Sequence, residues 1–183
     1  VKETIILLSR VPMLTTLVMN DGILERVVAS VVNTAHGDLP ANTNLLSPPK
    51  DEFSVYKQAD TLYINPASFD RYRPYAEAFA QMETEDILAL YAKYSEQLNA
   101  QFDEIAAPGT TFKETLIDAI NQLLDTPAVS LPIAVQTDRA MYQFVNPQLE
   151  ALSPVQKQLL RMGPKNMRLV MRKLRDLRSA LQD

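Results

Sequence analysis

The chain has 183 residues, enough for one domain (1–183) with a buried core, and its 46% hydrophobic and 22% charged composition is ordinary for a globular protein. It contains no cysteine, which excludes disulfides, thiolate zinc sites and a cysteine nucleophile. Its net charge of -4 argues against general nucleic-acid binding, for which a basic domain is expected.

The first part of the chain is predicted to be helical. Residues 1–22 should form a helix in one or two pieces, because Pro12 breaks or starts a helix and an Asp-Gly pair stops one. Apolar residues then repeat every three to four positions, which predicts a helix over residues 23–35 despite its many valines. After a long loop, the alternating pattern of FSVYKQADTLYIN (53–65) predicts a small β-hairpin.

Three further helices are predicted in the middle of the chain. The first opens at Pro66 and carries its aromatic residues on one face. Thr84 is predicted to cap the second, whose apolar stripe extends to Ile105. The third follows Thr111, which has the capping-box spacing to Glu114.

The last part of the chain ends in two helices. Within residues 127–144, the apolar run AVSLPIAV (128–135) is expected to form an extended strand or loop, and Pro147 is expected to start a short helical turn. Ser153-Pro154 caps and begins the penultimate helix, and Gly163-Pro164 separates it from the final one. We therefore predict a mainly α fold, a compact helical domain with one small β-hairpin or short β element.

The motifs of common enzymes are missing from the sequence. The glycines are too scattered for a phosphate-binding loop, and no GxSxG nucleophile turn occurs. His36 is the only histidine, so a Ser-His-Asp triad would have to use it, although a loop histidine after a helix is the simpler interpretation. We expect no catalytic residue, no metal site and no cofactor, with a hydrolase built on His36 or on carboxylates as the alternative.

The sequence contains two clusters of carboxylate residues. Glu83, Glu85 and Asp86 form one, and Asp103 and Glu104 the other. Neither follows EF-hand spacing, and acidic residues in the first turn of a helix favour its dipole. We therefore interpret both groups as capping or solvated residues. A glycosidase-like pair is the alternative, and it depends on a distance between carboxylates that a sequence does not give.

The segment YINPASFDRYRPY (63–75) is rich in tyrosine and arginine. These residues combine large contact area with directed hydrogen bonds, which suits a binding groove. The candidate lining residues are Tyr63, Arg71, Tyr72, Arg73 and Tyr75. The alternative is that Tyr72 packs in the core while the arginines pair with acidic neighbours.

The final helix carries most of the positive charge. Residues 155–183 hold eight basic and two acidic side chains, a net charge of +6, so residues 1–154 carry -10. An apolar stripe extends from Met167 to Leu181, and basic residues repeat on the roughly opposite face. The predicted partner-binding residues are Lys165, Arg168, Arg172, Arg175 and, one turn before the corner, Arg161.

This basic face allows two interpretations. Lys165 and Arg168 fall in the first turns of the helix, where the dipole disfavours positive charge by about 0.3–1 kcal/mol each. Carboxylates of the acidic body, an anionic ligand or solvent would offset that cost. The face is therefore either solvated and partly salt-bridged, or a surface for anionic lipid headgroups, an acidic protein or an envelope polyanion.

One ordered series of segments extends through the chain: LERVVASVVN, GDLP, NPASFDRYRPY, ALYAKYSEQL, FKETLIDAINQLLDTP, MYQFVNPQLEALSPVQKQLLRMGP and the final basic helix. In content and order, this series resembles bacterial domain-of-unknown-function family 3014. The resemblance covers nearly the whole chain from Ile23. The family pattern often has an acidic residue after Met-Gly-Pro, where this chain has Lys165.

The resemblance implies no established activity, but it implies a location. Such proteins typically carry an N-terminal transmembrane helix and a proline-rich linker, so we expect a periplasmic domain tethered to the inner membrane of a Gram-negative bacterium. No such span is in this sequence, whose apolar run at residues 5–8 is far short of the roughly 18 residues required. We expect a non-catalytic interaction or scaffolding domain that binds an acidic partner through the final helix; the alternatives are the hydrolase and a module for anionic lipid or polyanion.

Overall fold

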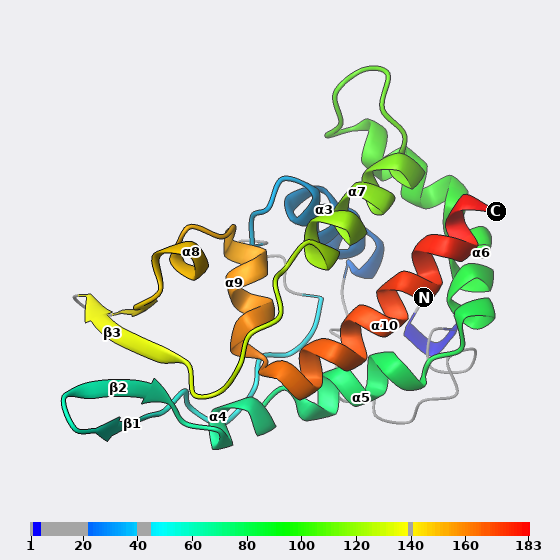
Figure 1. The fold of residues 1–183 in the computed structure, drawn as a ribbon. Coiled ribbons are helices and arrows are strands. Elements are labelled where there is room, and N and C mark those ends of the chain that lie inside the picture. The colour runs from blue at the N-terminus through cyan, green and yellow to red at the C-terminus, as the bar shows by residue number, and fades with distance from the viewer. Residues whose placement is uncertain (1, 5–21, 40–44, 139–140) are drawn as a thin grey trace.

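The computed structural model describes residues 2–4, 22–39, 45–138 and 141–183 (Figure 1). The elements from residue 22 onward are, in chain order, α3 (Ile23–Ala35), β1 (Val55–Gln58), β2 (Thr61–Ile64), α4 (Ala67–Asp70), α5 (Arg73–Gln81), α6 (Thr84–Asp103), α7 (Phe112–Leu124), β3 (Ala134–Asp138), β4 (Met141–Phe144), α8 (Pro147–Glu150), α9 (Pro154–Arg161) and α10 (Pro164–Gln182). The fold is mainly α with a small β element, which confirms the predicted class. The helix expected over residues 1–22 falls largely outside the described residues.

The β element is larger than the predicted hairpin. β1 and β2 form that hairpin, and β3 and β4 extend it to a four-stranded antiparallel sheet in the order β1-β2-β3-β4. Leu62 of β2 pairs with Val135 of β3. Val135 and Phe144 are buried in the cluster that the sheet shares with α9 and α10. The run AVSLPIAV (128–135) therefore includes only the start of β3, and the second hairpin continues beyond it to Phe144.

Two predicted helix boundaries are wrong. The helix expected from Pro66 is divided into α4 and α5, and Pro74 lies in the first turn of α5, where proline favours a new start. Thr84 is not the cap of α6, because the N-cap position is Glu83 and no side chain caps the helix. Since α6 ends at Asp103, Ile105 lies beyond the apolar stripe and is 58% exposed.

Other helix starts agree with the sequence. The capping box of Thr111 and Glu114 precedes α7, and Ser153 forms a second one with Gln156 before α9. Pro147 begins the short helix α8, as predicted.

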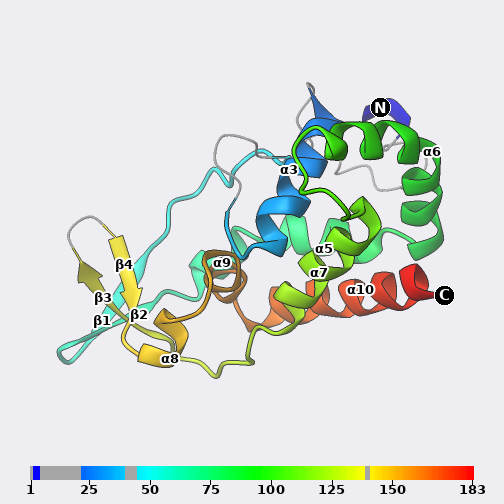
Figure 2. The same ribbon diagram turned by 90° about the horizontal axis from the view of Figure 1, so that it is seen from above.

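Helix α10 extends from the middle of the molecule to one of its ends. Figures 1 and 2 show the sheet and α8 at one end and α6 and the C-terminus at the other, and α10 runs from beside α9 to this second end, next to α5 and α7. Met167 and Met171 pack into the cluster with the sheet, whereas Leu174, Leu177 and Leu181 pack with Ile120 of α7. The predicted stripe of α10 therefore faces the core.

Candidate interaction surface

The basic helix begins at a corner that packs tightly against α4. Gly163 has a φ of 84°, and a Cβ atom added there would lie 2.4 Å from Cγ of Phe69. Asn166 is buried, and its Nδ2 donates to the carbonyl oxygens of Phe69 at 2.7 Å and Met162 at 2.9 Å. These contacts hold the first turn of α10 in place and so determine the direction in which its exposed residues point.

Four cations of α10 form one exposed face, which we call the basic ridge: Lys165, Arg168, Arg172 and Arg175. Within the described ranges, none of the four side chains forms an ion pair or a hydrogen bond. The ridge is about 15 Å long at the rise of an α-helix. The described carboxylates of the acidic body therefore do not neutralise it by direct contact.

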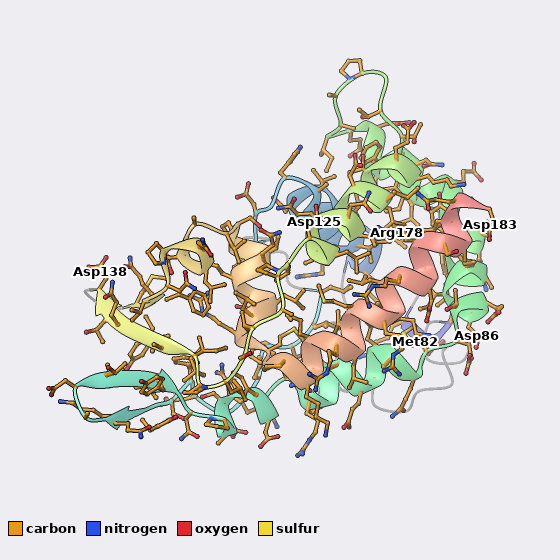
Figure 3. The ribbon with its side chains drawn as sticks, viewed as in Figure 1. Met82, Asp86, Asp125, Asp138, Arg178 and Asp183 are labelled. Atoms are coloured by element: carbon orange, nitrogen blue, oxygen red, sulfur yellow. The ribbon has the colours of Figure 1, made fainter. Side chains whose placement is uncertain are left out.

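The two other cations of α10 lie away from this ridge. Arg178 is half-buried toward α7, where its Nη1 donates to Oδ1 of Asn121 at 3.0 Å (Figure 3). Lys173 is only 9% exposed, so its aliphatic stem is covered by the packing of the helix. Both side chains therefore contribute to packing rather than to the exposed face.

Arg161, which was expected to extend the ridge, lies against strand β4. Its Nη2 donates to the carbonyl oxygen of Tyr142 at 3.3 Å, and its guanidinium lies 5.4 Å from the centre of the Phe144 ring. Oε2 of Glu150 accepts a hydrogen bond from the Phe144 amide at 2.8 Å. Side chains of α8 and α9 thus satisfy two backbone groups of this strand, which lies at an edge of the sheet.

Glu150 is the acidic centre of this cluster. Oε1 of Glu150 accepts a hydrogen bond from Nζ of Lys157 at 2.8 Å. Burial by itself would raise the pKa of Glu150, but the bonds from Lys157 and Phe144, with the charges of Lys157 and Arg161, outweigh it and hold the pKa below its ordinary value. The ionised carboxylate is therefore the form that the fold stabilises.

The residues predicted to line a tyrosine and arginine groove lie in several environments. Tyr63 stacks on Tyr56 with 5.5 Å between the ring centres. Arg71 donates to the carbonyl oxygen of Ser68, and its guanidinium lies over the ring of Tyr72 at 5.1 Å. Arg71 therefore links α4 to the aromatic side of α5.

The remaining candidate groove residues are Tyr72, Tyr75 and Arg73. Tyr72 accepts a hydrogen bond from Nε2 of Gln158 at 2.8 Å, and its ring centre is 6.4 Å from that of Tyr75. Burial, with Tyr72 nearby, raises the pKa of Tyr75, whose hydroxyl donates to the carbonyl oxygen of Ser47 at 2.7 Å. Arg73 is exposed and pairs with Asp70. The structure thus brings Arg71, Tyr72 and Tyr75 together, and it places Tyr63 and Arg73 elsewhere.

Arg73 instead approaches the basic ridge at a hollow beside the corner, which we call the corner hollow. Its volume is about 700 Å³. Its wall includes Asp70 and Arg73, together with Lys165 and Arg168 of α10. The start of α4, the α9–α10 corner and the loop between α7 and β3 supply its apolar residues. The end of the basic ridge that Lys165 and Arg168 form therefore lines a concave surface.

A second hollow, of about 420 Å³, lies among α3, α5, α6 and α7. The described side chains that line it are apolar or tyrosine, with no carboxylate, histidine, lysine or arginine among them. This lining offers apolar contact area but no pair of groups for acid–base or nucleophilic chemistry.

The groups considered for hydrolysis lie apart. His36 is exposed at the C-terminal end of α3. The two carboxylate groups lie at opposite ends of α6, with Glu83, Glu85 and Asp86 at its N-terminal end and Asp103 and Glu104 at its C-terminal end. Within the described residues, no three His, Cys, Asp or Glu side chains gather where they could hold a metal ion. In the same part of the chain, no helix has the length and apolarity that a membrane crossing requires.

Sequence reasoning missed two buried polar residues near the corner, Asn166 and Ser68. Ser68 Oγ accepts a hydrogen bond from the Ser54 amide at 2.8 Å and donates to the Ser54 carbonyl oxygen at 3.0 Å, which ties the segment before β1 to α4. The available signal was a small polar residue beside a buried apolar one, Asn166 before Met167 and Ser68 before Phe69. A polar side chain at such a position needs a partner.

Comparison with known proteins places the chain in a family but not with any characterised relative. No curated protein and no solved structure matches it. The model of the family described as "Protein of unknown function (DUF3014)" matches residues 23–178. That match starts at the first residue of α3 and ends within α10, so it includes the sheet, the corner and the whole basic ridge. The chain therefore belongs to the DUF3014 family.

Proposed function

We propose that this domain is a non-catalytic interaction module that binds an acidic partner protein through the basic ridge. The observation that supports the proposal most is that all four cations of the ridge are exposed and unpaired within the described part of the chain. A partner with several carboxylates would supply the charges that the domain does not place there.

The energetics of α10 also favour a partner. Lys165 lies in its first turn, where the helix dipole disfavours positive charge by about 0.3–1 kcal/mol, and Arg168 follows in the second turn, where this effect is weaker. The ridge residues also follow one another at spacings of three and four, at which like charges repel by about 0.2–0.5 kcal/mol per pair. Carboxylates of a partner would relieve both effects.

The net charge favours a compact acidic partner over nucleic acid. The whole chain carries -4, so a long polyanion that reaches beyond the ridge would meet the acidic body. A protein segment with a few carboxylates can contact the ridge alone. Such contacts weaken as salt rises, because the Debye length is only about 8 Å at physiological ionic strength.

Fluorescence anisotropy with a labelled short oligoglutamate peptide tests the ridge. The test variant carries Arg168→Glu, Arg172→Glu and Arg175→Glu. The control variant carries Lys50→Glu, Lys93→Glu and Lys113→Glu, which change three exposed lysines outside α10 and lower the net charge by the same amount.

We expect the wild-type affinity to fall with salt and the ridge variant to lose about tenfold or more, which corresponds to roughly 1.4 kcal/mol. The control should stay within about twofold of wild type at equal salt. Equal weakening of both variants would mean that net charge alone governs binding, and would overturn the proposal.

We propose the periplasmic face of the inner membrane as the location, and the family resemblance is the only support for it. A reporter enzyme that is active only after export, fused to the C-terminus of the full-length gene product, should be active in cells. An inactive but stably produced fusion would contradict this location.

A further inference from the structure

The corner hollow combines positive charge with apolar surface. Arg73, Lys165 and Arg168 line it, and Asp70 is the only carboxylate among its described lining residues. Asp70 and Arg73 are 3.4 Å apart, between Oδ1 and Nη1. Pairing with Asp70 therefore accounts for one of the three cations, and Lys165 and Arg168 supply a net positive charge that no described side chain neutralises.

Apolar residues complete the wall of the corner hollow. Phe69, Met162 and Gly163 come from the packed corner, and Leu131 comes from the loop before β3. Leu131 is 51% exposed, so about half of its side chain is open to solvent at the hollow. An exposed apolar residue beside unpaired cations is typical of a protein interface, where an apolar anchor is surrounded by polar contacts.

Resting on the proposed function, we propose that the corner hollow receives one apolar side chain of an acidic peptide segment. The carboxylates that flank this side chain bind Lys165 and Arg168, and the following acidic residues continue along the basic ridge. The volume of about 700 Å³ is ample for a leucine-sized side chain with part of its backbone.

The same geometry disfavours the other anions. Polyphosphate has no group to cover Leu131 and Phe69, so it would gain nothing from the apolar wall. A flat surface of anionic headgroups would bring negative charge against Asp70, whose side chain is 64% exposed at the rim. A peptide carries its apolar side chain and its carboxylates on different residues. This matches the corner hollow, where the apolar residues and the cations are also different residues of the wall.

Two labelled peptides of equal charge test this inference on the whole chain. One has four glutamates around a central leucine, and the other has the same glutamates around a serine. Each is titrated by anisotropy into wild type, into Leu131→Ser and into the control Ile105→Ser, which changes an equally exposed apolar residue outside the hollow. Far-UV circular dichroism checks that both variants fold.

We expect the leucine peptide to bind wild type and Ile105→Ser about tenfold tighter than the serine peptide, the order expected for burying one aliphatic side chain. In Leu131→Ser the preference should fall to about twofold or less, while the affinity for the serine peptide stays unchanged.

The other outcomes separate the two proposals. Equal affinity of wild type for both peptides would overturn the hollow and leave the ridge proposal standing. Failure of both peptides and of the oligoglutamate peptide to bind would overturn the ridge proposal and the hollow proposal together. Tighter binding of polyphosphate or of phosphatidylglycerol vesicles than of the leucine peptide, lost in the ridge variant, would replace the peptide by a polyanion or a lipid surface.

Discussion

At the scale of single residues, Gly163 and Asn166 explain why the basic ridge begins where it does. Gly163 packs against the Phe69 side chain because it has no Cβ atom, and Asn166 donates a buried hydrogen bond to the Phe69 carbonyl oxygen. A glycine-proline pair alone predicts only that one helix stops and another starts. The contact with Phe69 additionally sets the angle of α10 against α4.

Gly163→Ala should lower the free energy of unfolding by about 3 kcal/mol. The positive φ of Gly163 is strained for alanine, and the added Cβ would overlap the Phe69 ring. Gly109→Ala is the matched control, because Gly109 has a φ of 88° but no atom within 4 Å of the added Cβ. Urea unfolding should show a loss of only about 1 kcal/mol for the control. Equal losses would mean that the Phe69 contact is unimportant.

Arg161 shows the limit of prediction at this scale. Its position one turn before the corner predicted that it would extend the basic ridge, but its side chain donates a hydrogen bond to the carbonyl oxygen of Tyr142 in β4 instead. The two residues are 19 positions apart and meet only because the sheet packs beside α9. By contrast, the exposure of Lys165 follows from its helical spacing within α10.

At the scale of elements, the cluster around Glu150 joins α8, α9 and β4. Glu150 bonds to Lys157 of α9 and to the backbone of Phe144 in β4. These bonds give α8 and α9 a fixed place at the edge of the sheet. They also make the stability of this region depend on pH.

Glu150→Gln should destabilise the protein by roughly 1 kcal/mol near neutral pH. The folded pKa of Glu150 is lowered from 4.5, so its stabilising contribution is present above that value and is lost as pH falls through the folded pKa. The difference between wild type and variant, measured by urea unfolding from pH 3 to 7, should therefore shrink below about pH 4.5. A difference that is constant across this range would contradict an electrostatic role.

At the scale of the whole molecule, the two ends share core residues. Leu123, Leu124 and Val170 pack both against the cluster of the sheet and against the cluster of α7 and α10. Because α7 and α10 contribute to both clusters, the sheet should not unfold while the helices remain folded.

We expect one cooperative transition, as the single domain predicted for residues 1–183 requires. In amide hydrogen exchange at increasing urea, the amides of β2–β3 and those of α7 should lose protection at the same urea concentration. Val170→Ala should lower this concentration equally for both groups. Loss of protection in the sheet at a clearly lower urea concentration would mean that the sheet and the helices unfold as two separate units.

The sequence alone determined what depends on neighbours a few positions apart. The capping boxes at Thr111 and Ser153, the first hairpin, the bounds of α3 and the shared face of the ridge all follow from such local spacing. Only the tertiary structure decided the pairing of Leu62 with Val135, the burial of Asn166 against Phe69, and the meeting of Arg73 with Lys165 and Arg168 at the corner hollow. These contacts join residues far apart in the chain, and their geometry depends on how whole elements pack rather than on any local pattern.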